Sequence, residues 1–154
     1  MIMKRSAPVN LYRAVGFTPP DAVKPRKVGK YPVLAKCGGG MFFDEMLEYR
    51  VWVHPHLVDP ADRIDPGTED YYYAFAVYAE ALKFARETPG AEEPLVLVRQ
   101  RAWVVQVEGG HYEGRKSGSR RDDRIAEWQV AWLEKGPRKK GDIEVFLAKH
   151  GKVA

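Results

Sequence analysis

The chain has 154 residues, of which 45% are hydrophobic and 30% charged, with one cysteine and a formal net charge of +4. This composition is typical of a folded globular domain of ordinary size and excludes an intrinsically disordered chain. No run of about 18 apolar residues is present, so the sequence predicts no transmembrane helix, and its first residues lack the apolar core of a signal peptide. A single cysteine, Cys37, cannot form an internal disulfide, which favours a reducing, cytoplasmic compartment.

Charge is distributed unevenly along the chain. Residues 1–40 carry eight Lys or Arg and one Asp, residues 41–93 carry four basic and twelve acidic residues, and residues 94–154 carry thirteen basic and eight acidic residues. Two interpretations are open. The basic ends fold against the acidic middle and neutralise it, or basic segments form a surface for an anionic ligand or nucleic acid.

The first third of the chain predicts little regular structure. Residues 11–15 are expected to form a short strand, and the proline-rich residues 18–30 a loop. A second short strand is expected at residues 31–36. It runs into three successive glycines, residues 38–40, which predict a turn or a backbone left bare for close approach.

The clearest predicted strand covers residues 47–54, where two kinds of side chain alternate. The hydrophobic set is Leu47, Tyr49, Val51 and Val53, and the other set is Glu48, Arg50, Trp52 and His54. This alternation predicts a half-buried strand, with the first set in the core and the second on the other face.

A strand and a helix are expected next. Residues 71–75, Tyr-Tyr-Tyr-Ala-Phe, have the aromatic composition of a short strand. From about Val77 the pattern becomes helical, with a buried stripe, and Thr88, Pro89 and Gly90 end it. The residues of that stripe are Tyr78, Ala81, Leu82 and Ala85.

The last third predicts strands joined by turns and a final helix. Residues 94–107 are expected to form a central strand with a bend near residues 99–101, followed by a hairpin-type turn at residues 108–111. A basic loop at residues 114–124 leads to a last strand that carries Trp128, Val130 and Trp132 as alternate residues. A final helix is expected from Asp142, with a stripe of Ile143, Phe146, Leu147 and His150.

Together these elements predict an α+β fold. We expect a loose arm at residues 1–10 and a single domain at residues 11–151, with a mostly antiparallel sheet of about five or six strands and two helices packed on one face.

Two places carry residue types found in catalytic or metal sites. Cys37 precedes three glycines, whose N–H groups could form an oxyanion hole if His54 or His111 supplied a base; a small buried side chain is the alternative. His54 and His56, followed by Asp59 and Asp62, have metal-ligand chemistry, but their spacing matches no closed site, so no metal is assigned.

The basic loop is the strongest candidate for anion binding. In residues 115–121, Arg-Lys-Ser-Gly-Ser-Arg-Arg, small residues allow backbone donors to approach a phosphate and the flanking arginines supply charge. An ordinary basic surface loop is the alternative. A second hypothesis is a stacking platform for single-stranded nucleic acid. Its members would be Trp52, Tyr71, Tyr72, Tyr73, Trp103, Trp128 and Trp132, with Arg50, Arg99 and Arg101.

Four phrases of the sequence together resemble a family of small bacterial proteins often labelled as GNAT-type acetyltransferases. The phrases are YRAVGFTPPDA at residues 12–22, YPVLAKCGGG at 31–40, EYRVW at 48–52 and TPGAEEPLVLVRQ at 88–100. The resemblance covers roughly residues 11–133. It implies acyl transfer from acetyl-CoA, which would enter between two splayed parallel strands beside residues 95–107.

The resemblance extends to the basic loop. The pyrophosphate-binding signature of GNAT enzymes is Arg/Gln-x-x-Gly-x-Gly/Ala, which this sequence matches at Arg115 and Gly118 and departs from at Arg120. A CoA site there would comprise Arg115, Gly118, Ser119 and Arg120. The alternative function is a non-catalytic module whose basic segments bind an anionic partner, either nucleic acid or an acidic protein. In either case the site is expected at the glycine turn after Cys37 or at the basic loop after Gly114.

Overall fold

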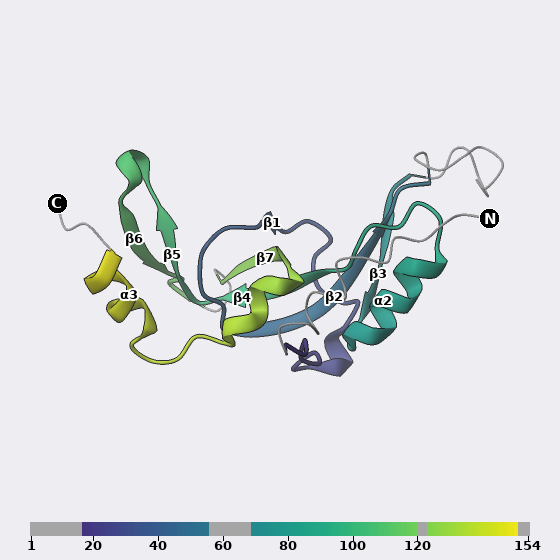
Figure 1. Cartoon of the computed structure of the whole chain (residues 1–154), viewed down its shortest axis with the longest axis horizontal. Helices are drawn as coiled ribbons and strands as arrows, with labels where there is room; N and C mark the ends of the chain where they lie inside the picture. Colours follow the sequence, from purple (N-terminus) through teal and green to yellow (C-terminus); the bar gives the residue numbers. More distant parts are fainter. Residues whose placement is uncertain (1–16, 56–68, 120–122, 151–154) are drawn as a thin grey trace.

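The structure, a computed structural model, describes residues 17–55, 69–119 and 123–150 (Figure 1). It confirms the expected α+β class: a mixed five-stranded sheet, a two-stranded sheet and short helices. The strands are β1 (Lys36–Cys37), β2 (Glu45–Val53), β3 (Tyr71–Phe75), β4 (Leu95–Gln100), β5 (Ala102–Gln106), β6 (Tyr112–Lys116) and β7 (Arg124–Gln129). The helices are α2 (Tyr78–Glu87) and α3 (Asp142–His150), with 3-10 turns η1 (Pro25–Lys27), η4 (Glu108–Gly110) and η6 (Val130–Lys135).

The five-stranded sheet has the order β1-β7-β4-β2-β3. Its pairs are antiparallel except β1 with β7, which run parallel over two residues. The expected strand at residues 31–36 is therefore mostly wrong, because only Lys36 of that segment joins the sheet. The carbonyls of Pro32 and Val33 accept hydrogen bonds from the Arg50 side chain instead. The expected arm at residues 1–10 and strand at residues 11–15 lie outside the described residues.

One face of the sheet forms the hydrophobic core with α2. The helix packs on β2 and β3 through the predicted stripe of Tyr78, Ala81, Leu82 and Ala85, all of which are buried. A β-bulge between Met46 and Glu48 changes the predicted alternation, so that Met46 takes the place expected for Leu47 in the core cluster.

The opposite face of β2 is buried as well, which differs from the alternation's prediction of a half-buried strand. Glu48 and Arg50 are both 0% exposed. The segment that precedes β1 lies over them and accepts two hydrogen bonds from Arg50. Arg50 also forms ion pairs with Glu48 (Nε–Oε2 2.8 Å) and with Glu127 of β7 (Nη1–Oε2 3.0 Å). A buried charge is tolerated because it is paired and hydrogen-bonded.

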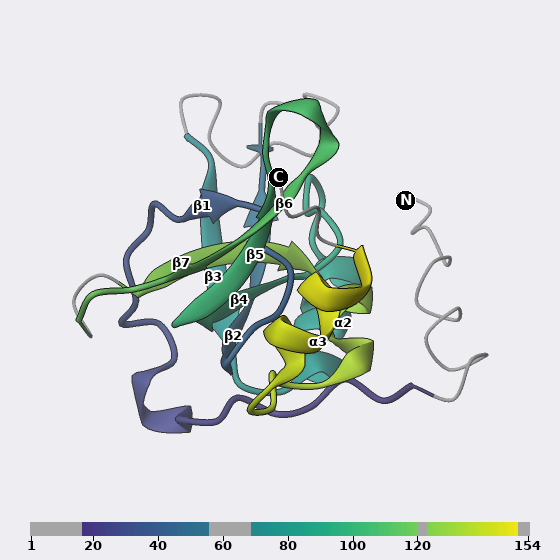
Figure 2. The same cartoon turned by 90° about the vertical axis from the view of Figure 1, so that its left-hand side faces the viewer.

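The predicted central strand at residues 94–107 is two strands in two sheets. Arg101 separates β4 from β5, and its backbone N–H donates to the Asp44 carboxylate at 2.7 Å, which holds the bend. After the bend, β5 pairs with β6 as an antiparallel hairpin closed by η4, so the expected turn at residues 108–111 is confirmed. The two helices pack against different sheets. Helix α2 packs on β2 and β3 of the five-stranded sheet, whereas α3 packs against β6 of this hairpin (Figure 2).

The last predicted strand ends earlier than expected. Strand β7 stops at Gln129, and residues 130–135 form the 3-10 turn η6, so Trp132 does not continue the strand. Gly136 follows with φ 81°, and its N–H donates to the Leu133 carbonyl, as at many helix ends. This turn moves Trp132 off the sheet and beside the glycine turn.

Among the described residues, no helix is both long and apolar enough to cross a bilayer.

Candidate functional site

The glycine turn after Cys37 is held in a conformation that few side chains tolerate. Gly38, Gly39 and Gly40 have φ values of 53°, 72° and 64°, and Phe42 has φ 77°. These left-handed values are easy for glycine and costly for other residues. A non-glycine residue such as Phe42 keeps this geometry only when its surroundings fix it.

Three side chains of the sheet fix the turn by donating to its carbonyl oxygens. Gln100 donates to the carbonyls of Gly40 and Phe42, the latter at 2.9 Å. Arg124 donates to Gly38 O at 3.0 Å and to Gln100 Oε1 at 2.5 Å. Burial lowers the pKa of the Arg124 guanidinium, which nevertheless stays charged at neutral pH.

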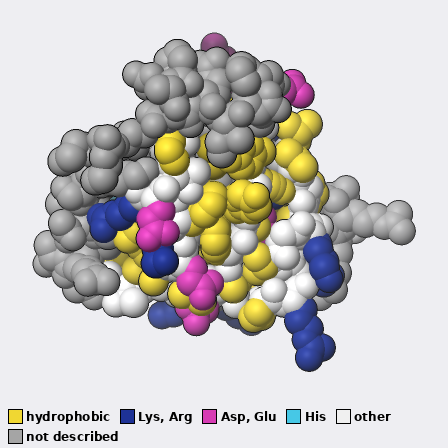
Figure 3. All heavy atoms as spheres, turned by 90° about the vertical axis from the view of Figure 1, so that its right-hand side faces the viewer, with side chains coloured by type: hydrophobic (Ala, Val, Ile, Leu, Met, Phe, Trp, Pro, Cys, Tyr) yellow, Lys and Arg dark blue, Asp and Glu magenta, His cyan; other side chains and the backbone are white. Residues whose placement is uncertain are grey.

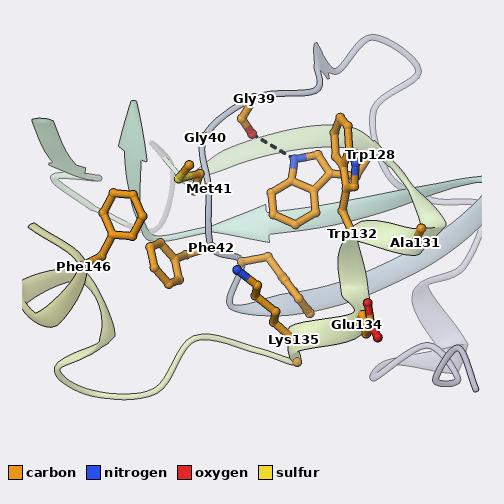
Figure 4. Close-up of a pocket in the computed structure, with 12 residues that line it drawn as sticks. Gly39, Gly40, Met41, Phe42, Trp128, Ala131, Trp132, Glu134, Lys135 and Phe146 are labelled. Atoms are coloured by element: carbon orange, nitrogen blue, oxygen red, sulfur yellow. Dashed lines mark hydrogen bonds between the residues drawn. The ribbon is translucent and has the colours of Figure 1, made fainter. Parts of the chain in front are cut away.

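Trp128 is the third of these donors, and its ring also lines a pocket. Its Nε1–H donates to Gly39 O at 2.9 Å, which orients the indole against the turn (Figure 4). The ring of Trp132 meets it edge-on, with centroids 5.7 Å apart, and Phe43 meets it from another side at 5.6 Å. The three rings form one continuous aromatic wall.

The pocket between the glycine turn, β7, η6 and α3 has a volume of about 520 Å³. This is the size of many small-molecule sites, and its lining is mainly apolar, as theirs is. It is lined by Gly39, Gly40, Met41, Phe42, Phe43, Trp128, Ala131, Trp132, Glu134, Lys135, Gly136 and Phe146. Below we call it the glycine-turn pocket.

Three distant parts of the chain build the glycine-turn pocket. Phe42 follows the glycine turn, and Phe146 of α3 meets it edge-on at 5.8 Å. Trp132 and Met41 remain 46% and 42% exposed, so a large apolar surface faces the solvent at the pocket. Exposed apolar surface gathered around a hollow commonly marks a binding site.

Lys135 is the one basic residue in the pocket lining. Its side chain extends from η6 into the pocket with the ammonium group directed toward Phe42, whereas the Glu134 carboxylate points away (Figure 4). Among the described residues, the Lys135 ammonium group forms no ion pair with a carboxylate. The pocket therefore combines flat apolar walls with one available positive charge.

The residues expected to bind CoA do not gather at this pocket. Arg115 lies in β6, and its guanidinium pairs with Glu113 of the same strand at 2.8 Å. Gly118 and Ser119 lie in the loop after β6, and Arg120 lies outside the described residues. Strand β7, rather than a helix, follows this loop.

The strands beside residues 95–107 do not form the splayed parallel pair that the acyltransferase interpretation requires. Strand β4 pairs with β7 in antiparallel fashion from Leu95↔Gln129 to Gln100↔Arg124, without a register shift. Strand β5 pairs in antiparallel fashion with β6. The parallel pair of β1 and β7 is two residues long. Neither β4 nor β5 leaves an opening for a nucleotide at these pairings.

Cys37 lies exposed at the end of β1, on the edge of the sheet. Its exposure excludes the alternative of a small buried side chain. Within the described part of the chain, no histidine is hydrogen-bonded to its thiol, so the pairing expected of a nucleophile and a base is not formed there.

His54 lies between two carboxylates. Its Nδ1 is 2.9 Å from Asp70 Oδ2, and its Nε2 contacts Glu92. Partial burial lowers the pKa of His54, but the hydrogen bonds to Glu92 and Asp70 outweigh it, so the pKa is raised. His56 lies outside the described residues, and within the described ranges no three His, Cys, Asp or Glu side chains are placed to hold a metal ion.

The proposed stacking platform does not assemble as one surface. Arg50 is buried under the ring of Tyr72, 4.4 Å from its centroid, and Trp52 donates to the same Glu127 carboxylate that Arg50 binds. We call Glu48, Arg50, Trp52, Tyr72 and Glu127 the Arg50 cluster. Its cation is fully engaged inside the protein, while Trp128 and Trp132 lie on the other face in the glycine-turn pocket.

No protein-family model, curated protein or solved structure matches this chain.

The sequence pointed to one part of the pocket, the glycine turn after Cys37. It did not identify Met41, Phe42, Lys135 or Phe146, because three separate segments bring them together. One local signal was available. Gly136 directly after Lys135 is typical of a helix end, and a helical turn there would have turned Lys135 and Trp132 away from the strand.

Proposed function

We propose that this protein is a non-catalytic binding module whose glycine-turn pocket holds a small anionic ligand with a flat apolar part. The observation that carries this proposal is the combination of an aromatic wall, partly exposed, with the Lys135 ammonium group inside the same 520 Å³ pocket. A planar group would stack on the exposed ring of Trp132 and contact Trp128 beside it, and a carboxylate or phosphate would lie beside Lys135.

The chemistry of the pocket favours binding over catalysis. Besides Lys135, its lining contains one carboxylate, which points away, and no histidine, cysteine or hydroxyl side chain. Lys135 therefore has no second catalytic group beside it in the pocket, whereas acid–base and nucleophilic catalysis commonly pair a nucleophile with a base. The rigid glycine turn, held by three side-chain donors, supports a preformed site instead.

The basic segment that follows η6 supports an anionic ligand. Lys139 and Lys140 are exposed in the loop between Lys135 and α3, while Arg138 is engaged with Asp44 at 2.6 Å. These lysines would add a favourable field for an anion approaching the pocket, and this contribution would weaken with salt.

The test is fluorescence titration with 8-anilino-1-naphthalenesulfonate, a flat apolar anion. We expect saturable binding that Lys135→Glu weakens by roughly tenfold, since a charge-assisted contact contributes about 1.5 kcal/mol. Lys149→Glu makes the same charge change on α3 outside the pocket lining and should leave the affinity within a factor of about two. Equal effects of the two variants, or no saturable binding, would overturn the proposal.

The acyltransferase hypothesis is tested in the same experiment. Acetyl-CoA, CoA and a short single-stranded oligonucleotide serve as competitors of the fluorescent anion. Acetyl-CoA that binds without displacing the anion would point to a separate CoA site at the Arg115 loop. Displacement by the oligonucleotide, with a steep salt dependence, would favour a nucleic-acid partner.

A further inference from the structure

Strand β3 is an edge strand of the five-stranded sheet, at the end of the strand order away from the pocket. It pairs with β2 on one side, and no strand of the described residues pairs with it on the other. Its five residues, Tyr-Tyr-Tyr-Ala-Phe, include no charge and no proline, and no bulge interrupts its pairing with β2. Natural sheets usually protect a free edge with one of these features, because unpaired N–H and C=O groups bind other strands.

The same edge carries an exposed aromatic cluster. Tyr71 and Tyr73 are 36% and 53% exposed, with their rings 5.7 Å apart. Phe84 of α2 meets both Tyr73, at 5.0 Å, and Phe75, at 5.5 Å. Figure 3, which faces this end of the molecule, shows hydrophobic side chains gathered in its middle.

We propose that β3 pairs in antiparallel fashion with β3 of a second copy of this chain, which joins two five-stranded sheets into one. A two-fold axis through Tyr73 would place Tyr73 opposite its own copy and Tyr71 opposite Phe75, so aromatic side chains meet on the α2 side. On the other face Tyr72 would lie opposite Ala74, which leaves room for the larger ring.

The charges of this segment favour a second copy as the occupant. A two-fold axis through Tyr73 would place a charge at position 73 opposite its own copy and would bring charges elsewhere in the strand near like charges of the partner, but Tyr71–Phe75 carries no charge. The acidic residues before the strand avoid each other in this register. Asp70 would lie opposite Ala76, and Glu69 opposite Val77. The pairing would also leave the glycine-turn pocket open, because its lining comes from the turn after β1, from β7 and from segments that follow β7, whereas β3 is at the other end of the strand order.

Sedimentation of the full chain over a wide concentration range tests this pairing. We expect a species of twice the 17.5 kDa chain mass, and Tyr73→Lys should raise its dissociation constant at least about tenfold, through like charges across the axis and loss of the ring contact. Val145→Lys places the same charge on a 67% exposed apolar residue of α3 and should leave the dimer unchanged.

A wild-type chain that stays monomeric, a Tyr73→Lys variant that dimerises like wild type, or a Val145→Lys variant that loses the dimer would each overturn the proposal. If the circular dichroism of Tyr73→Lys shows that this variant does not fold, hydrogen exchange of the wild-type chain tests the pairing instead. Amides of residues 71–75 should become more protected as the concentration rises, and equal exchange at all concentrations overturns the pairing.

Discussion

The Arg50 cluster and the glycine-turn pocket lie on opposite faces of the same sheet and use similar side chains in different ways. Each combines tryptophan with a long cation. In the cluster, Arg50 is 0% exposed and binds two carboxylates and two carbonyls of the chain itself. In the pocket, Lys135 has no carboxylate partner among the described residues and Trp132 is 46% exposed. A cluster whose polar groups are all satisfied internally holds the fold, whereas one that leaves them available suits a ligand.

The largest effect is expected from breaking the Arg50 cluster. Arg50→Ala leaves the buried Glu48 carboxylate without its cation, so we expect a loss of about 3–5 kcal/mol in the free energy of unfolding. Urea denaturation measures it. Arg115→Ala removes an exposed pair with Glu113 and should cost less than about 1 kcal/mol. Similar losses in the two variants would show that the cluster is not what fixes this face.

The next effect concerns the glycine turn. A Cβ added at Gly40 would lie 2.9 Å from Arg124 Nη1 and 2.9 Å from Gln100 Nε2, in addition to the strain of φ 64°. Gly40→Ala is expected to cost about 2–4 kcal/mol, since the left-handed strain alone costs about 1–2 kcal/mol.

Gly29→Ala is the matched control for this prediction. Gly29 has φ 85°, and a Cβ there meets nothing within 4 Å, so only the strain remains. The difference between the two variants in thermal or urea unfolding isolates the packing of Gln100 and Arg124 under the turn. Equal losses would mean that this packing does not hold the pocket wall.

A smaller effect, on binding and not on stability, is expected from the exposed aromatic wall. Trp132→Ala should weaken binding of the naphthalenesulfonate by roughly tenfold, because stacking on an aromatic side chain contributes about 1–3 kcal/mol. Its unfolding free energy should change little, since the side chain is half exposed. Trp103→Ala, in the hairpin and outside the pocket lining, should leave the affinity unchanged. A larger loss of affinity in Trp103→Ala than in Trp132→Ala would show that the anion binds outside the pocket.

The smallest effect is expected at His54. Its ion pairs with Asp70 and Glu92 are partly exposed, so they are less buried than the Arg50 cluster. Its pKa is raised in the folded chain, so its imidazolium stabilises the fold fully below about pH 6.5, and the contribution is lost as the pH rises through the folded value. Because Asp70 and Glu92 are 42% and 50% exposed, the contribution should stay below about 1 kcal/mol. His54→Gln should remove this pH dependence from urea midpoints. An unchanged pH profile would contradict the two ion pairs.

The sequence predicted the elements that local periodicity determines. The helix stripe of α2, the strand β2 and the turn at residues 108–111 follow from spacing and turn residues. It did not predict that Arg50 is buried, because alternation distinguishes two faces without showing what covers the second one. The covering segment lies 17 residues from Arg50 in sequence, at Val33.

The candidate site was harder to predict than the fold. The glycine run is recognisable as unusual. The alternate residues Trp128, Val130 and Trp132 predict one strand, which is correct for Trp128 in β7 and wrong from Val130, where η6 begins. The pocket depends on contacts between residues 39–43, 128–136 and 146, which no local pattern connects. Loop and turn conformations of this kind are fixed by tertiary hydrogen bonds, here from Gln100, Arg124 and Trp128.

The four tryptophans allow a direct test of whether the glycine-turn pocket binds a flat anion. Their indole N–H groups give separate signals in an NMR spectrum of the ¹⁵N-labelled chain, assigned with single Trp→Phe variants. On addition of the naphthalenesulfonate, the signals of Trp128 and Trp132 should shift, while those of Trp52, in the Arg50 cluster, and Trp103, in the hairpin, should not. Shifts at Trp52 or Trp103, with the signals of Trp128 and Trp132 unchanged, would show that the anion binds outside the glycine-turn pocket.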